Sequence, residues 1–324
     1  MSRREQGGCF VKVLAAKFLV TFMTGLNANA AMHTPLDLPL LTQASAPLTT
    51  EIVAMDEHGT AQRVSIPAER ALTVYVDTRE LVTLMTLGAQ PELLVLGYLR
   101  NQRLVRNVQE IESITVDWEV GAAAVKTRHG IDDLDAKTAR RVVTTGCGQG
   151  SVFGGLMDEV ASLALPPDAH IRQSQLYSLV NTIRLKETTY KSAGSVHACA
   201  LFSTASDQAE MLLFVEDVGR HNAIDTIAGW MWMQPDILAV DAHPVFYTTG
   251  RLTSEMVIKS AQMGVPIVVS RSGITQMGHQ VAQSVGLCAI GRATNRRFLC
   301  YSHPERLLLQ AGLAARTGLG DQSM

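Results

Sequence analysis

The chain has few cysteines, and none are spaced as a pair. Its 324 residues contain only five: Cys9, Cys147, Cys199, Cys288 and Cys300. No two of them form a C-x-x-C motif. Disulfide frameworks use an even number of cysteines, and structural zinc sites use closely paired ones. The pattern argues against both, and it favours reduced thiols in a cytoplasmic protein.

The chain also lacks an excess of basic residues. Twenty-eight lysines and arginines stand against 30 acidic residues, which gives a formal net charge of -2. A surface that follows a nucleic-acid backbone needs a strong basic excess, so we expect no nucleic-acid partner. The length allows two domains, and a hydrophobic fraction of 47% is ordinary for a globular protein.

A long uninterrupted apolar run is missing as well. Residues 9–26 are mostly apolar, but Lys12 and Lys17 interrupt them, so a membrane span is not expected. With the small residues 27–31 that follow, this stretch resembles a signal peptide. A translation start at Met32 or an unstructured leader also explains it, and we favour these two explanations over export. No membrane partner is therefore expected.

Among the features that are present, a glycine-rich run around Cys147 is the most unusual. Residues 144–155 read TTGCGQGSVFGG and follow a strand-like stretch at residues 140–145. Glycine loses the most backbone entropy on ordering, so this run predicts a flexible loop. A thiol on such a loop suits a reactive cysteine, whereas a buried thiol is inert. The spacing alone leaves both interpretations open.

Apolar patterning divides the remaining chain into two regions. Residues 49–139 contain predicted hairpins and a helix starting at Pro91, which together indicate a small α+β subdomain. Residues 140–310 alternate strands and helices, as in a partly parallel sheet with helices on its faces. Residues 1–48 are assigned to a leader and linker, and residues 311–324 to a flexible tail.

The same patterning places individual elements. Helices are predicted in four further segments: residues 174–185, 223–232, 254–263 and 275–285. Hairpins are predicted from residues 51–55 with 63–66 and from 71–76 with 81–85, and weaker strands at 114–117 and 122–126. The later strands are predicted at residues 195–202, 210–215, 245–248, 265–270, 287–290 and 298–301. Cys199, Cys288 and Cys300 lie within apolar strands, so we expect them in the core.

A dense polar run follows the strand at residues 210–215. It reads EDVGRHNAID and begins at residue 216. Asp217 suits capping of the turn, Arg220 suits a phosphate contact, and His221 suits proton transfer. A structural cluster of caps and ion pairs is the alternative for each of them.

Two basic connections follow successive strands. Arg271 and Ser272 follow one strand, and Arg292, Arg296 and Arg297 follow the next. Guanidinium groups and helix N-terminal amides bind phosphate oxygens. A solvated turn explains any single arginine, but two basic connections together favour an anionic, phosphate-bearing ligand.

Three longer runs resemble the FdhD/NarQ family of formate dehydrogenase accessory sulfurtransferases. They are VEDVGRHNAID, GRLTSEMVIKSAQMGVPIVVSRSG and CYSHPER. The resemblance covers residues 50–306 and implies a cytidine-deaminase-like core, with a mixed sheet flanked by helices. It also implies the small N-terminal α+β subdomain and a homodimer. Such proteins receive sulfur from a cysteine desulfurase as a cysteine persulfide and pass it to bis-molybdopterin guanine dinucleotide, the cofactor of formate dehydrogenase.

The resemblance also implies roles for particular residues. Cys147 matches the persulfide cysteine, whose thiolate must be accessible and near positive charge. The matching cofactor-binding loop consists of Arg292, Ala293, Thr294, Asn295, Arg296 and Arg297. The candidate supporting residues are Asp217, Arg220, His221, Arg271 and Ser272. No bound metal of the chain's own is expected.

Two departures from related patterns leave alternatives open. Many family members have a second cysteine three positions after the first, where this chain has Gly150. One thiol can carry a persulfide but cannot form a local disulfide. A zinc deaminase needs H-x-E and P-C-x-x-C, and Cys199 stands where that glutamate would be. The alternatives are a non-catalytic molybdenum-cofactor chaperone and, less favoured, a zinc-dependent hydrolase of deaminase type.

Overall fold

The computed structural model describes residues 37–131, 163, 165–186, 188–234, 236 and 243–314. The chain divides into two compact units, Met1–Asp37 and Leu38–Met324, and every element below belongs to the second. The predicted strand at residues 140–145 and the loop carrying Cys147 lie outside the described residues. Within the described ranges, no helix is long and apolar enough to cross a bilayer.

The N-terminal region forms a five-stranded sheet in the order β1-β6-β7-β4-β5. Its strands are β1 (Leu40–Leu41), β4 (Arg70–Val76), β5 (Arg79–Thr86), β6 (Ile111–Asp117) and β7 (Ala122–Thr127). Helix α1 (Pro91–Asn101) starts at Pro91 as predicted and packs its apolar face on this sheet. A short 3-10 helix, η1 (Val108–Glu110), precedes β6. Strand β1 lies in the stretch assigned to a linker, and its pairing with β6 corrects that assignment locally.

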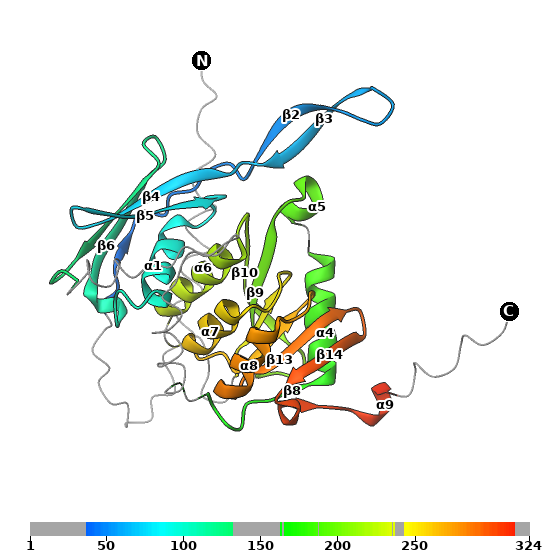
Figure 1. Ribbon diagram of the computed structural model, residues 1–324. Helices are drawn as coiled ribbons and strands as arrows, with labels where there is room; N and C mark the ends of the chain where they lie inside the picture. Colours follow the sequence, from blue (N-terminus) through cyan, green and yellow to red (C-terminus); the bar gives the residue numbers. More distant parts are fainter. Residues whose placement is uncertain are drawn as a thin grey trace, which may run out of the picture. The chain divides into compact units, whose positions relative to one another are not determined.

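Strands β2 (Thr49–Met55) and β3 (Ala61–Pro67) form a separate two-stranded ribbon (Figure 1). Asp56 stabilises the turn between β2 and β3, because its carboxylate accepts hydrogen bonds from the amides of His58 and Thr60. Both predicted hairpins are therefore confirmed, since β4 and β5 also pair in antiparallel fashion.

The second sheet has six strands in the order β10-β9-β11-β12-β13-β14. They are β9 (His197–Ser203), β10 (Glu210–Asp217), β11 (Val245–Thr248), β12 (Ile267–Ser270), β13 (Cys288–Thr294) and β14 (Arg297–Ser302). The central strands β11, β12 and β13 are parallel, and the outer pairings are antiparallel. The mixed α/β architecture predicted from the sequence is thus confirmed.

Helices cover both faces of the six-stranded sheet. Those on one face are α6 (Arg220–Met233), α7 (Ser254–Gln262) and α8 (Gln276–Val285), and α4 (Gln173–Leu185) lies on the other. Strand side chains alternate between the two cores, so that Phe246 packs with α6–α8 and Tyr247 packs on the α4 side. The remaining short elements are β8 (Ile171–Arg172), α5 (Thr189–Ala193), η2 (Pro304–Arg306), β15 (Leu307–Leu308) and α9 (Ala311–Ala314).

Element boundaries near the predicted site needed correction. Helix α6 starts at Arg220, three residues before the predicted start, because the polar first turn carries no apolar periodicity. The predicted cofactor loop, residues 292–297, is mostly part of a hairpin, since β13 continues to Thr294 and β14 begins at Arg297. Helix α8, by contrast, has the expected limits, with Thr275 as its N-cap and Gly286 in a left-handed conformation at its end.

Helices α1 and α6 join the two sheets through a close backbone contact. A Cβ atom on Gly97 would lie 1.6 Å from the carbonyl oxygen of Asp225, and one on Gly229 would lie 2.0 Å from that of Leu93. The Nδ2 of Asn101 also donates to Asp225 Oδ1 at 2.7 Å. Only glycine allows this approach, so the N-terminal region packs directly against the helix that follows the polar motif.

Candidate functional site

Asp217, the first candidate of the polar motif, ties the two sheets together. Its carboxylate accepts hydrogen bonds from Thr86 Oγ1, Leu87 N, Gly219 N and Asn222 Nδ2. Burial raises the pKa of Asp217, and these donors oppose that effect. The contacts favour the structural alternative for this residue, because all four donors come from the protein itself.

His221 belongs to a buried charge cluster with Asp225, Glu255 and Lys259. Its Nε2 lies 3.1 Å from Glu255 Oε2. Lys259 Nζ lies 2.9 Å from Asp225 Oδ2 and 3.8 Å from Glu255 Oε1. Burial alone would raise the pKa of Glu255, but the hydrogen bond from His221 and the charge of Lys259 bring it below its ordinary value. Opposite charges are therefore paired within the core.

Arg220, the first residue of α6, passes close to the backbone of Gly250. A Cβ atom on Gly250 would lie 2.8 Å from Arg220 Cδ. Glycine at position 250 therefore leaves room for the Arg220 side chain beside the backbone. Burial lowers the pKa of His197, and the nearby positive charge of Arg220 lowers it further. A neutral His197 can accept or donate a hydrogen bond in the cavity that it lines.

That cavity, which we call the basic pocket, has a volume of about 540 Å³. Four cationic side chains line it: Arg184, Lys186, Lys191 and Arg271. Its aromatic lining consists of Tyr190, Phe214 and Tyr247. Its carboxylate, Glu216, accepts hydrogen bonds from the amides of Thr189 and Tyr190 at 2.7 and 3.2 Å. Cations beside aromatic rings suit a flat ligand that carries negative charge.

The structure brings the two predicted basic connections together at this pocket. The amide of Arg292 donates to the carbonyl of Ser272 at 2.7 Å, which holds β13 beside the end of β12. Arg271 lines the basic pocket together with three residues of the predicted cofactor loop: Ala293, Thr294 and Asn295. Ser272, Arg292 and Arg297 are not among its lining residues.

A second cavity, of about 810 Å³, lies on the other side of Asn295, and we call it the polar pocket. Arg296 lines it with its guanidinium carbon 5.9 Å from the centre of the Tyr177 ring. Arg184 and Asn295 line both cavities, so the hairpin tip separates them. Of the six residues predicted for the cofactor loop, four line a pocket: Ala293, Thr294, Asn295 and Arg296. Arg292 and Arg297 lie in the strands, and only Asn295 and Arg296 form the turn.

Sequence reasoning missed several lining residues. Lys186, Tyr190 and Lys191 come from the connection around α5, and His197 begins β9. The run KETTYKSAG shows no periodicity, and its basic residues resemble an ordinary solvated turn. Their convergence with Arg271 depends on how the strands are ordered in the sheet, which local patterns do not encode.

The three cysteines within the described ranges differ in how deeply they are buried. Cys199 is buried, and burial raises its pKa to about 12, so the expected core position is confirmed. Cys288 is likewise buried. Cys300 is only half-buried, which corrects the expectation for that residue. In the described parts of the chain, no three metal-ligating side chains gather to hold an ion. Cys147, the principal candidate, is not among the described residues.

Comparison with known proteins adds to this geometry. The model of the FdhD/NarQ family matches residues 67–308. A "Sulfur carrier protein FdhD" of Bacillus subtilis is 32% identical over 240 residues, covering 74% of this chain and 88% of the relative. One of Staphylococcus aureus is 28% identical over the same shares.

A solved structure shares the fold. It is a protein of Desulfotalea psychrophila described as a "putative formate dehydrogenase accessory protein". It aligns with a TM-score of 0.63 and 23% identity, over 81% of this chain and the whole of that chain. The family match covers the five-stranded sheet apart from β1, the whole six-stranded sheet, the polar motif and the hairpin that separates the two pockets. The chain belongs to the FdhD/NarQ family.

Proposed function

We propose that this protein is a sulfurtransferase that carries sulfur as a persulfide on Cys147 for the maturation of a formate dehydrogenase. Family membership supports sulfur carriage, because curated relatives are named sulfur carrier proteins. The thiolate of Cys147 attacks the outer sulfur of a cysteine desulfurase persulfide. A new sulfur–sulfur bond forms on Cys147, and the desulfurase cysteine leaves as a thiolate.

The acceptor in this proposal is bis-molybdopterin guanine dinucleotide, which the protein handles as substrate. The observation that carries the proposal is the basic pocket, whose wall includes part of the hairpin that the family resemblance assigns to this cofactor. Arg271, Lys186 and Lys191 suit the diphosphate oxygens. Tyr190 and Phe214 offer rings on which a guanine can stack, and the amide of Asn295 suits its polar edge.

Further parts of the proposal depend on the family resemblance alone. They are a cytidine-deaminase-like arrangement of the core, a homodimer and a cytoplasmic location. The partners are a cysteine desulfurase as sulfur donor and a formate dehydrogenase as client.

Persulfide mapping tests the sulfur step directly. The full chain is incubated with a cysteine desulfurase and free cysteine, alkylated, digested and analysed by mass spectrometry. We expect an added sulfur on Cys147 and the same labelling in a Cys199→Ser control, because Cys199 is buried and has a raised pKa. An unlabelled Cys147 in protein whose circular dichroism shows it to be folded would refute the proposal.

A cofactor chaperone without sulfur transfer is the second candidate. Gly150 favours it, because this chain lacks the second cysteine that many relatives have at that position. A Cys147→Ala variant that still activates formate dehydrogenase fully would establish this candidate over the sulfurtransferase.

A further inference from the structure

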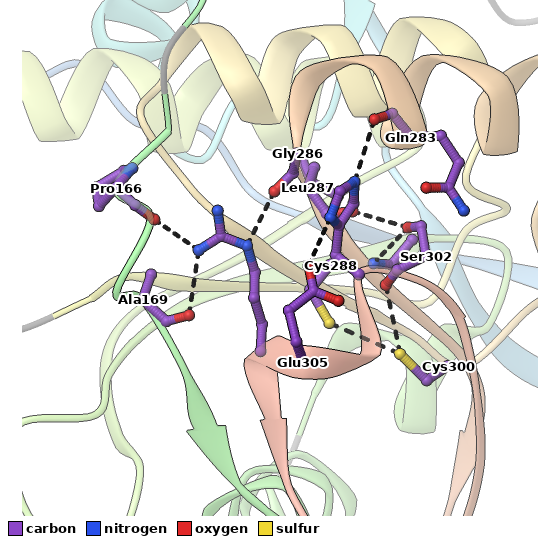
Figure 2. Close-up of polar contacts among 12 residues, drawn as sticks. Pro166, Ala169, Gln283, Gly286, Leu287, Cys288, Cys300, Ser302 and Glu305 are labelled. Carbon is purple, nitrogen blue, oxygen red and sulfur yellow. Dashed lines mark hydrogen bonds and ion pairs between the residues drawn. The ribbon is translucent and has the colours of Figure 1, made fainter.

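Two cysteines outside the proposed sulfur site lie in contact at the base of the β13–β14 hairpin. The Sγ atoms of Cys288 and Cys300 are 3.8 Å apart (Figure 2). The strands pair Ala289 with Ser302 but Ile290 with Cys300, so the register shifts by one residue there. This irregularity places Cys300 diagonally beside Cys288, with both sulfurs against the core on the α4 side of the sheet.

The two thiols differ in exposure and acidity. Cys288 is fully buried, whereas Cys300 is half-buried and within reach of small solutes. The hydrogen bond from Cys288 lowers the pKa of Cys300, because it stabilises the Cys300 thiolate. The same bond, together with burial, raises the pKa of Cys288. Cys300 is therefore suited to attack a solute, and Cys288 is suited to react afterwards within the protein.

The backbone around the pair is held by a polar frame, part of which Figure 2 shows. Ser302 Oγ accepts from the amide of Ala289 at 3.0 Å and donates to the carbonyl of Leu287 at 2.7 Å. Arg306 donates to three carbonyl oxygens, those of Gly286, Pro166 and Ala169. A disulfide needs a sulfur–sulfur distance of about 2.0 Å, so closure requires mainly that two sulfurs already in contact approach each other.

We propose that Cys288 and Cys300 form a reversible disulfide that crosslinks the base of the β13–β14 hairpin in response to low-molecular-weight disulfides. The Cys300 thiolate attacks one sulfur of glutathione disulfide, forms a mixed disulfide and releases one glutathione thiolate. Cys288 then gives its proton to solvent and attacks Cys300 Sγ, which releases the second glutathione. Two protein thiols are oxidised, and one glutathione disulfide is reduced to two thiols.

This crosslink acts on the element that separates the two pockets. The hairpin tip opposite the cysteine pair carries Asn295, which lines both the basic and the polar pocket. A covalent bond between β13 and β14 limits how far the strands can shift past each other at their irregular register. The inference depends on the cysteine geometry and not on the proposed function, so the disulfide can form whatever ligand the pockets bind.

Redox titration of the full chain tests the proposal. The protein is equilibrated at several ratios of oxidised to reduced glutathione, trapped with an alkylating reagent and digested with trypsin. We expect a linked pair of peptides, residues 272–292 and 298–306, lighter by two hydrogens than the two free peptides together. The linked fraction should rise with the oxidised ratio and disappear with dithiothreitol. The thermal midpoint should rise in parallel, because the crosslink restricts the unfolded chain.

Matched variants separate the outcomes. Cys300→Ser should abolish both the linked peptides and the redox dependence of the thermal midpoint, and its half-buried position keeps folding intact. Cys288→Ala should leave glutathione attached to Cys300, because no second thiol can displace it. The control, Cys199→Ser, should behave like the unchanged chain. The proposal is overturned if both cysteines are alkylated at every ratio, or if the unchanged chain accumulates only the mixed disulfide on Cys300.

Discussion

The buried charge cluster between α6 and α7 and the basic pocket beside the β13–β14 hairpin both gather charged residues, but in different ways. In the cluster, Lys259 and Asp225 lie 2.9 Å apart, with side chains only 2% and 0% exposed. In the pocket, lining cations outnumber carboxylates, and Glu216 is bonded to backbone amides. A buried cluster of paired charges fits a structural role, whereas a cavity with excess positive charge fits an anionic ligand.

The comparison also shows that a specific sequence motif can contribute little to a cavity: of the motif EDVGRHNAID, only Glu216 is among the described lining residues of the basic pocket. In the described residues, the motif places Asp217 and Asp225 where they bind other parts of the protein. The basic pocket takes most of its charge from segments whose sequence is unremarkable. The contacts of Asp217 and Asp225 hold the six-stranded sheet and α6 against the N-terminal region. The strands of the six-stranded sheet in turn position the pocket residues.

Removing the central cation of the cluster should give the largest effect. Lys259→Met leaves the carboxylate of Asp225 buried without its partner, and we expect a loss of about 3–5 kcal/mol in the free energy of unfolding. Urea denaturation followed by circular dichroism measures it. The control is Lys126→Met, which removes an exposed ion pair with Glu112 of 2.7 Å and should cost about 0–1 kcal/mol. Similar losses in both variants would remove the distinction between buried and exposed charges.

A change in the basic pocket should affect binding and leave stability nearly unchanged. Guanosine diphosphate is a suitable probe, because it carries a guanine and a diphosphate. Arg271→Ala should weaken its binding roughly tenfold, which corresponds to about 1.4 kcal/mol. Isothermal titration calorimetry measures the affinity, with Arg63→Ala, exposed on β3, as the control. An unchanged affinity in Arg271→Ala would contradict the assignment of this pocket to an anionic ligand.

The smallest expected effect concerns acid sensitivity in the cluster. The pKa of Glu255 lies below its ordinary value of 4.5 in the folded protein, so its ionised form favours folding. This contribution is present above the unfolded pKa and is lost as the pH falls through the folded value.

Glu255→Gln should therefore flatten the decline in stability below about pH 4.5. Denaturation midpoints at several pH values measure the slope. Glu112→Gln, at an exposed carboxylate, should keep the slope of the unchanged chain. A Glu255→Gln variant as acid-sensitive as the unchanged chain would show that Glu255 is not preferentially ionised in the fold.

Local patterns predicted most elements, because caps, glycines and apolar alternation act within a few residues. The N-cap Thr275 and the terminating Gly286 set the limits of α8 in sequence and structure alike. Contacts between distant segments could not be predicted in this way. Thr86 and Asp217 are 131 positions apart, and no local signal pairs them. The same holds for the lining of the basic pocket, which depends on strand order.

The glycine contact between α1 and α6 has a consequence for the order of events during synthesis. Asn101 in α1 meets Asp225 in α6, and 124 positions separate them in the chain. A ribosome therefore completes the first sheet long before the helix that covers α1 emerges. Until then, Gly97 and Asn101 lack the α6 groups that they contact in the folded protein. The contact between α1 and α6 therefore adds to the contact order of the fold, and contacts between segments so distant in the chain slow folding.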